Sequence, residues 1–353
     1  MKIPGVSKLR RMAKRLRGRL APGGLILMYH RITEVESDPW SICVSPRHFA
    51  QQMEVLHKFG EVVSLQQLNQ TLQQGKTPHW QIAVTFDDGY TDNLYNAKPL
   101  LERYDIPATM FLTSGYMEQK RDLWWDELNR LLLEPGCLPE VLCLEINGTT
   151  HRWELGTAAN YSEEEYQRVD AKRLVVRHRH WRALGEDNPT PRHTLYRTLY
   201  WLLSPLLPEA RQKVMDQMLA WGDCVPTLRP NHRILNLEEV STLGSELISI
   251  GAHSVTHPFL SFLPTARQRE EIQDSKTHLE EIIGQKVVSF AYPHGNYSEE
   301  TAGLVREAGF MSACTTYPRT VRRQCDRFQL PRVVVEDWDG EEFAKQLSEW
   351  RAS

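Results

Sequence analysis

Two kinds of cross-link or anchor are missing from this sequence. None of its six cysteines forms a C-x-x-C pair, so neither a cysteine metal site nor a disulfide framework is indicated, and free or buried thiols in a reducing compartment fit better. No uninterrupted apolar stretch approaches the roughly 20 residues that span a membrane. The apolar run at 25–28 is too short for the core of a signal peptide, because it stops at Tyr29 and His30. These absences predict a cytoplasmic protein.

The composition also excludes several classes of protein. Of the 353 residues, 41% are hydrophobic, 9% aromatic and 25% charged, which argues against disorder, collagen and coiled coil. A chain longer than about 250 residues forms one large domain with insertions or two smaller domains. In either case it can bury a substantial core.

Acidic residues are absent from the first 20 positions. Eight of the 42 basic residues lie there, so the rest of the chain carries 34 basic against 45 acidic side chains. In residues 6–20 apolar residues recur every three or four positions, which predicts a basic amphipathic helix. Such an arm, residues 1–20, fits peripheral contact with the anionic inner face of a membrane, and a helix packed on its own domain gives the same pattern. The acidic remainder argues against nucleic acid as a partner.

Strand and helix patterns alternate in two parts of the chain. A helix is predicted at 46–59, and buried strands are predicted at 25–30, 81–86, 108–112, 247–252, 287–291, 311–315 and 333–335. Helical patterns separate most of them, so we expect a parallel sheet or barrel with its active site at the carboxyl ends of the strands. The predicted barrel comprises 21–115 and 236–353.

Residues 116–235 break this alternation and are predicted to be a mainly helical insertion. Helices are expected at 124–133, 162–184, 193–207 and 209–221, with a hairpin at 141–153 turning at Asn147 and Gly148. The insertion is rich in tryptophan, which indicates a core of its own, and a sugar-stacking surface is the alternative. It follows a barrel strand, so it should rise from the active-site face.

Two adjacent carboxylates, Asp87 and Asp88, close the strand at 81–86. In a strand they would point to opposite faces, but at its end the chain turns at Gly89 and both can reach one pocket. Carboxylates this close repel unless a cation lies between them, so one acting as a ligand and the other as a base is a stable arrangement. An Asp-Gly turn with a capping Asp is the plain structural alternative.

Two histidines, His253 and His257, follow another strand end. Imidazoles four residues apart can converge on one metal ion, although the pattern alone is weak. At a shared barrel mouth, Asp88 would complete a set of three ligands and leave a position open for water or substrate.

Taken in order, the segments 85–90, 253–257 and 290–295 resemble the polysaccharide deacetylases of carbohydrate esterase family 4. The resemblance covers roughly 25–115 and 236–340. It implies a distorted (β/α) barrel and a metal-dependent hydrolase that removes acetyl groups from sugars. It further implies that Asp87 is the catalytic base, that Asp88, His253 and His257 bind the metal, that the backbone N–H of Tyr90 helps hold the oxyanion, and that Tyr292 and Pro293 line the acetyl-binding groove.

Two departures from that family's pattern are visible. Many members carry an Arg in the third segment and a Leu-x-His late in the chain that supplies the general acid, whereas this chain has Leu330-Pro331-Arg332. The segment 28–32 is similar to the N-terminal motif of the biofilm poly-N-acetylglucosamine deacetylases, in which an early His takes that place. The resemblance therefore implies that His30 is the general acid, and a His that only forms hydrogen bonds within the barrel is the alternative.

These observations predict a metal-dependent de-N-acetylase acting on an amino sugar in a glycan or glycolipid assembly route, with Zn²⁺ as the expected metal and another divalent ion as the alternative. An O-acetyl esterase on the same site and a non-catalytic carbohydrate-binding protein stay open. A glycosidase is disfavoured, because neighbouring acids do not place their carboxyl groups about 5–10 Å apart across a sugar.

The substrate is an N-acetylated sugar, an oligosaccharide or a lipid-linked glycan, and the sequence does not choose among them. We expect the insertion to form a lid or wall for a short or carrier-bound substrate.

Overall fold

The computed structural model of the chain describes residues 23–59, 61–75, 79–167 and 178–352. The basic arm at 1–20 lies outside these residues. No helix in the described part is long and apolar enough to cross a membrane. The helices are α2 Pro46–Phe59, α3 Leu65–Gln73, α4 Lys98–Arg103, α5 Trp124–Leu133, α6 Glu163–Gln167, α7 Pro191–Leu203, α8 Pro208–Trp221, α9 Leu237–Leu243, α10 Thr265–Ile283, α11 Glu299–Glu307 and α12 Gly340–Ala352.

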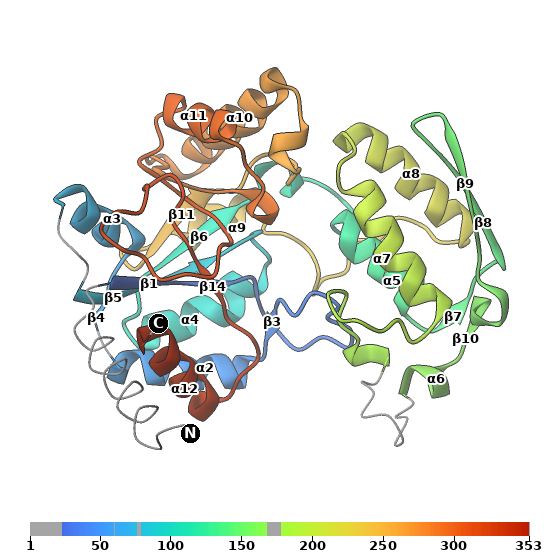
Figure 1. Cartoon of the computed structure of the whole chain (residues 1–353), viewed down its shortest axis with the longest axis horizontal. Helices are drawn as coiled ribbons and strands as arrows, with labels where there is room; N and C mark the ends of the chain where they lie inside the picture. Colours follow the sequence, from blue (N-terminus) through green and yellow to red (C-terminus); the bar gives the residue numbers. More distant parts are fainter. Residues whose placement is uncertain (1–22, 60, 76–78, 168–177, 353) are drawn as a thin grey trace, which may run out of the picture.

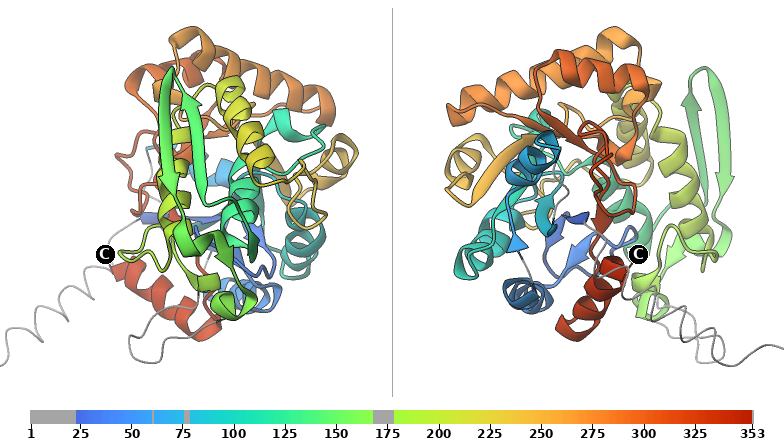
Figure 2. Two further views of the ribbon diagram at one scale, coloured as in Figure 1. Left: turned by 90° about the vertical axis from the view of Figure 1, so that its right-hand side faces the viewer. Right: turned by 60° about the vertical axis from the view of Figure 1, so that its left-hand side comes forward.

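A curled parallel sheet lies at the centre of the larger part of the molecule (Figures 1 and 2). Its order is β13-β12-β11-β6-β5-β1-β14, with β4 beside β5, and all of its strand pairs are parallel. A parallel bridge between Cys314 and Leu330 links β13 to the segment before β14, so the sheet curls towards closure. This confirms the predicted distorted (β/α) barrel. The strands are β1 Gly23–Tyr29, β2 Arg31–Ile32, β3 Cys43–Val44, β4 Glu61–Val62, β5 His79–Phe86, β6 Ala108–Leu112, β7 Gly136–Cys137, β8 Val141–Ile146, β9 Thr149–Glu154, β10 Asn160–Tyr161, β11 Ile248–Ala252, β12 Ser289–Ala291, β13 Ser312–Cys314 and β14 Val333–Val334.

The sheet is covered on both faces, and its strands show this in their composition. All seven residues of β1 are buried. Leu25, Leu27 and Tyr29 belong to one hydrophobic cluster, whereas Ile26 belongs to another. A strand buried on both sides needs apolar residues at successive positions, which is why β1 lacks the alternation of a half-exposed strand.

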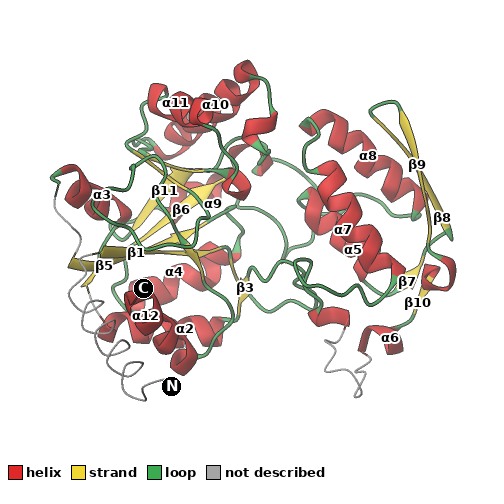
Figure 3. Cartoon of the chain, in the orientation of Figure 1, coloured by secondary structure: helices red, strands yellow, loops and turns green. Residues whose placement is uncertain are grey.

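The insertion packs beside the barrel and has a hydrophobic cluster of its own. α5 and α7 lie on the side nearest the barrel, and the β8–β9 hairpin lies on the far side (Figures 1 and 3). The hairpin turns at Asn147 and Gly148, both at positive φ, as predicted. The single helix predicted at 162–184 is wrong at its carboxyl end, since α6 and a 3₁₀ turn at His178–His180 are followed by non-helical residues 181–184.

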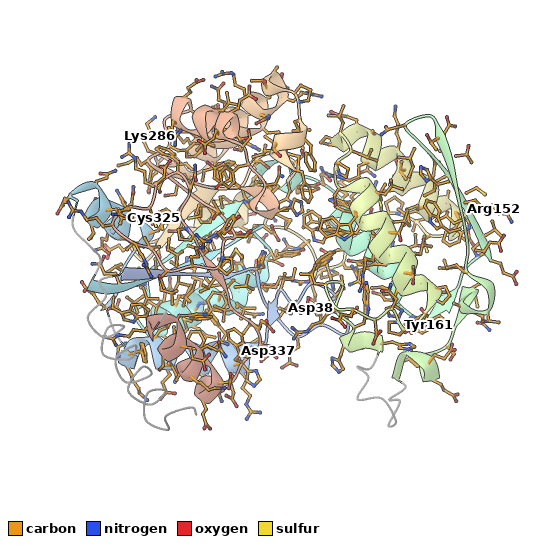
Figure 4. The ribbon with its side chains drawn as sticks, in the orientation of Figure 1. Asp38, Arg152, Tyr161, Lys286, Cys325 and Asp337 are labelled. Carbon is orange, nitrogen blue, oxygen red and sulfur yellow. The ribbon has the colours of Figure 1, made fainter. Side chains whose placement is uncertain are left out.

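The loop between β2 and β3 connects the two parts. Asp38, labelled between them in Figure 4, accepts hydrogen bonds from the backbone N–H groups of Ile42 and Cys43. This fixes the turn from which Trp40 reaches the insertion, where its indole N–H donates to the hydroxyl of Tyr196 at 2.7 Å. The insertion is therefore held to the barrel by contacts besides its chain connections.

Candidate active site

The end of β5 turns so that Asp87 and Asp88 reach the same side of the barrel mouth. Asp88 and Gly89 both have positive φ, 71° and 84°. A Cβ atom at position 89 would lie 2.9 Å from Leu112 Cδ2, so only glycine fits this turn without displacement. The predicted reversal of direction after the strand is confirmed.

The loop after β11 presents His253 and His257, and a glutamate holds it in shape. The carboxylate of Glu271, on α10, accepts hydrogen bonds from the backbone N–H groups of Val255 and Thr256, both at 2.8 Å, and from the Thr256 hydroxyl. The hydroxyl of Ser254 accepts from the backbone N–H of His257 at 3.0 Å. These hydrogen bonds hold the backbone of the loop that carries the two histidines.

Asp88, His253 and His257 converge on one buried point. Asp88 Oδ1 lies 3.2 Å from His257 Nε2 and 3.5 Å from His253 Nε2, and the three ligand atoms lie within 4.8 Å of one another. His253 Nδ1 lies 2.8 Å from the carbonyl oxygen of Ala291, which directs its Nε2 towards Asp88. Two imidazole nitrogens and a carboxylate oxygen fit a divalent metal such as Zn²⁺. The sequence had placed these three residues together.

The electrostatics of this cluster favour a charged carboxylate. Burial would raise the pKa of Asp88, but the two histidines hold it well below its usual range. Burial lowers the pKa of His257, although Asp88 opposes this. Burial also acts to lower the pKa of His253, and there Asp87 and Asp88 outweigh it and raise the pKa. Asp88 therefore presents a negative charge to the point on which the histidines converge.

Asp87 has a different partner. The guanidinium of Arg332 donates two hydrogen bonds to its carboxylate, Nη1 to Oδ1 and Nη2 to Oδ2, each 2.7 Å long. Burial would raise the pKa of Asp87, but Arg332 and then His253 hold it below its usual value. The structure separates the adjacent acids, Asp88 with the histidines and Asp87 with an arginine.

Arg332 is a residue that the sequence analysis missed, because it noted only that no His stood there. Its side chain is fully buried, and it also donates to the carbonyl of Thr315 and the hydroxyl of Thr85. The arginine that many family members carry in the third segment is absent at 290–295, and in space Arg332 brings a guanidinium to Asp87 from the late chain. An arginine just before a buried strand was the only signal in the sequence.

His30 lies at the end of β1, near both carboxylates. Its imidazole is close enough to act to lower the pKa values of Asp87 and Asp88, and its Nδ1 atom is buried without a hydrogen-bond partner among the described residues. Neighbouring residues fix its backbone. Its carbonyl accepts from the Asn93 side chain, and Arg31 forms an ion pair with Asp92. The strand end therefore delivers His30 to the mouth as predicted, and its role stays a prediction.

The three predicted substrate-binding residues occupy different surroundings. Tyr90 is buried and pairs with Ile234 in an isolated antiparallel bridge. The two hydrogen bonds of this bridge are formed by the residues directly before and after Tyr90, so the backbone N–H of Tyr90 takes part in neither. Tyr292 is also buried and donates its hydroxyl to the carbonyl of Phe328. Pro293 is buried beside it. Tyr292 belongs to the hydrophobic cluster of the barrel, and the lining of an acetyl-binding groove by Tyr292 and Pro293 stays a prediction.

The insertion contributes residues that the sequence analysis did not connect with the site. The ring of Trp125 lies 4.9 Å from that of His257. Asp126 accepts a hydrogen bond from the hydroxyl of Tyr90 at 2.8 Å, and burial raises the pKa of Asp126 to about 7. Because both belong to the first turn of α5, this helix forms one wall of the candidate site.

The fold is a parallel α/β barrel, and two adjacent acids and two histidines lie at the carboxyl ends of its strands. This combination is typical of barrel hydrolases. The family model described as "Polysaccharide deacetylase" matches residues 74–137 and 231–313. The chain is similar to this family over these two segments, which contain Asp87, Asp88, His253 and His257. Most of the predicted insertion falls between the two matched segments.

Individual relatives agree with this similarity. The chain is 22% identical over 312 residues to YxkH of Bacillus subtilis (strain 168), a candidate polysaccharide deacetylase, covering 88% of this chain and 70% of that one. Among solved structures, the Streptococcus pyogenes deacetylase PplD in complex with acetate is similar, with a TM-score of 0.55, 18% identity and coverage of 92% and 98%. IcaB from Ammonifex degensii gives a TM-score of 0.54, 19% identity and coverage of 94% and 98%. At these identities the structures support the fold.

Proposed function

We propose that the protein is a metal-dependent de-N-acetylase that hydrolyses the acetamide of an amino sugar in a glycan or glycolipid assembly route. The observation that supports this most is the convergence of Asp88, His253 and His257 beside an Asp87 that is paired with Arg332. This arrangement offers a metal site and a separate ionised carboxylate within one mouth.

Asp88, His253 and His257 would hold the metal, which we expect to be Zn²⁺. When bound, such an ion supplies Lewis-acid polarisation of a carbonyl and lowers the pKa of a water molecule. Both imidazoles must be neutral to act as ligands, and the contact between His253 Nδ1 and the Ala291 carbonyl selects the tautomer with a free Nε2.

Asp87 would accept the proton of the attacking water. A general base must be ionised at working pH and held in position. The two hydrogen bonds from Arg332 provide both, because the guanidinium offsets the cost of burying the charge and fixes both carboxylate oxygens. An amide N–H at Tyr90 would donate to the oxygen on which negative charge develops.

His30 would protonate the leaving amine. An amine leaves an amide readily only when its nitrogen is protonated, and a proton donor must therefore stand at the mouth. The place of His30 at the end of β1, close enough to act on both carboxylates, supports this role.

An O-acetyl sugar esterase would use the same groups, and its leaving alcohol needs less help from His30. A non-catalytic carbohydrate-binding protein is disfavoured by the complete set of ligand and base residues. The deciding experiment measures acetate release by purified protein from N-acetylated sugars, oligomers, lipid-linked glycans and O-acetylated counterparts, with and without a chelator. Chelator-sensitive release from N-acetyl substrates supports the proposal. Release confined to O-acetyl esters, or none under any metal, would overturn it.

We also propose a cytoplasmic location with peripheral attachment to the inner membrane face through the basic arm at 1–20. Each basic residue near an anionic surface contributes on the order of 1 kcal/mol. Full-length protein should sediment with anionic vesicles at low salt and be released by added salt. Equal sedimentation after deletion of 1–20 would contradict this attachment.

A further inference from the structure

The hydroxyl group of Tyr90 joins the barrel to the insertion beside the candidate active site. It donates a hydrogen bond to the Asp126 carboxylate at 2.8 Å and accepts one from the indole N–H of Trp125 at 2.9 Å. All three residues are buried, and Trp125 and Asp126 are neighbours in the first turn of α5. A phenolic hydroxyl is both a donor and an acceptor, so this helix uses both functions of the Tyr90 side chain.

A buried arginine covers the ring of the same tyrosine. The guanidinium carbon of Arg31 lies 4.4 Å from the centroid of the Tyr90 ring. Arg31 is held in turn by an ion pair with Asp92 at 3.1 Å, and the Asp92 carboxylate accepts from the backbone N–H of Ile32 at 2.8 Å. Contacts to the ring and to the hydroxyl therefore restrict the Tyr90 side chain together.

The backbone is hydrogen-bonded on both sides of Tyr90 but not at its own N–H. The carbonyl of Gly89 accepts from the N–H of Leu235 at 2.9 Å, and the N–H of Thr91 donates to the carbonyl of Arg233 at 3.2 Å. The N–H of Tyr90 donates to none of the described residues. It therefore stays free to donate to a ligand.

We infer that Trp125 and Asp126 are positioning residues, which fix the backbone N–H of Tyr90 by holding its side chain. This inference rests on the proposed function, in which that N–H donates to the oxygen that becomes negative. Such a donor lowers the barrier only when it is held in advance at the place where the charge develops. A displacement of about 1 Å costs on the order of 10²-fold in rate. The insertion then takes part in the chemical step through α5.

Trp124 provides an internal comparison, because it is buried in the same turn as Trp125 and lacks the hydrogen bond. Its indole Nε1 atom is buried and has no hydrogen-bond partner among the described residues. Replacing either tryptophan by phenylalanine keeps an aromatic ring in the core and removes one N–H group. Only the change at Trp125 takes a partner away from the Tyr90 hydroxyl.

The test compares the wild type with Tyr90→Phe, Trp125→Phe and Asp126→Ala, and Trp124→Phe is the control. The probe is a β-1,4-linked glucosamine pentamer that carries N-acetyl groups. Each of the three variants should lower kcat for acetate release roughly 10- to 100-fold, with KM and metal content close to those of the wild type. Asp126→Asn keeps an oxygen for the Tyr90 hydroxyl and should restore most of the rate. Trp124→Phe should have the kcat of the wild type.

Two further substrates distinguish a misplaced oxyanion donor from a general loss of structure. A trifluoroacetyl group withdraws electrons, so the negative oxygen that it forms depends less on the donor. On the same pentamer with N-trifluoroacetyl groups, the three variants should therefore lose less of their rate. The carbonyl oxygen of 4-nitrophenyl acetate develops the same charge as the acetamide, and its leaving group needs no proton. The variants should be slow on this ester as well, in contrast to the expectation for His30→Ala.

Two outcomes would overturn the inference and leave the proposed function standing. The first is acetate release at the wild-type kcat by Tyr90→Phe and Trp125→Phe. The second is an equal fold loss on the N-acetyl and N-trifluoroacetyl pentamers or a parallel loss of metal, because the contacts would then serve the fold alone. Tyr90→Phe removes a single oxygen atom, so it decides the question even if Asp126→Ala does not fold. If the wild type releases acetate from no substrate, the proposed function fails and this inference fails with it.

Discussion

Arg332 and Asp87 lie 245 residues apart in the chain and meet in the barrel as a buried, two-point ion pair. Arg332 is fully buried, so its charge has no solvent to stabilise it. A buried pair of this kind contributes through geometry, because it fixes both carboxylate oxygens of Asp87 next to the metal-ligand candidates. Removing either residue would therefore leave the other without its partner inside the barrel.

Breaking this pair from either side should destabilise the fold. Arg332→Met leaves Asp87 as an uncompensated buried charge, which costs roughly 3–5 kcal/mol. In urea unfolding, Arg332→Met and Asp87→Asn should each lose stability, and the double variant should lose clearly less than the two losses together. The exposed pair of Arg306 and Asp326 is the control, and Arg306→Met should cost no more than about 1 kcal/mol. Additive losses at Arg332 and Asp87 would show that the pair is not coupled.

The hydrogen bonds from Glu271 should be needed for metal affinity. Glu271→Gln loses the negative charge that accepts three hydrogen bonds from the histidine loop. Groups that orient ligands in this way are typically worth 10–100-fold in metal affinity. Metal titration should therefore show weaker binding by Glu271→Gln, while Glu270→Gln, an exposed neighbour paired with Arg267, should bind as the wild type does. Unchanged affinity in both would assign Glu271 a purely structural role.

Removal of one ligand candidate should remove the metal. His257→Ala takes away one of three converging ligand atoms, so elemental analysis should find markedly less metal and acetate release should fall with it. His151→Ala, a hairpin histidine stacked on Trp153, is the matched control and should change neither. Retention of full metal content and rate by His257→Ala would exclude this residue from the site.

His30 should matter more for amides than for activated esters. A proton donor contributes roughly 10²–10⁴-fold in rate, and an aryl ester has a leaving group that needs no proton. His30→Ala should keep its metal and lose kcat on the N-acetyl sugar far more than on the ester. Equal losses on the two substrates would point to another role, and wild-type turnover of the amide would exclude His30 from the chemistry.

Asp126 should make stability depend on pH. Burial raises its pKa from 3.8 to about 7, so between these values the folded protein binds a proton that the unfolded chain has lost. Stability should therefore fall as pH rises from about 4 to about 7, by at most about 4 kcal/mol from this residue. Asp126→Asn keeps an oxygen for Tyr90 and should flatten the dependence, measured as the free energy of unfolding at pH 5 and pH 8. The same slope in both proteins would show that other groups cause it.

The strands and the chemistry at their ends could be predicted because both are local. β6 and α5 begin and end where the sequence pattern predicts, and the run of apolar residues in β1 is sufficient for a strand buried on both faces. Asp88 follows β5, and His253 and His257 follow β11. Both strands pair in parallel with β6, so their carboxyl ends lie at the same edge of the sheet. Periodicity and motif spacing therefore lead to the barrel and to the three ligand candidates.

The partners of these residues depend on distances that no local pattern encodes. Arg332 meets Asp87 because β14 lies beside β1, which in turn pairs with β5, and Glu271 meets the histidine loop because α10 packs against it. Trp125 reaches His257 because α5 folds back onto the barrel mouth. A buried guanidinium and an exposed one have the same letter in a sequence. The burial that gives Arg332, Glu271 and Trp125 their surroundings exists only once the core has closed around them.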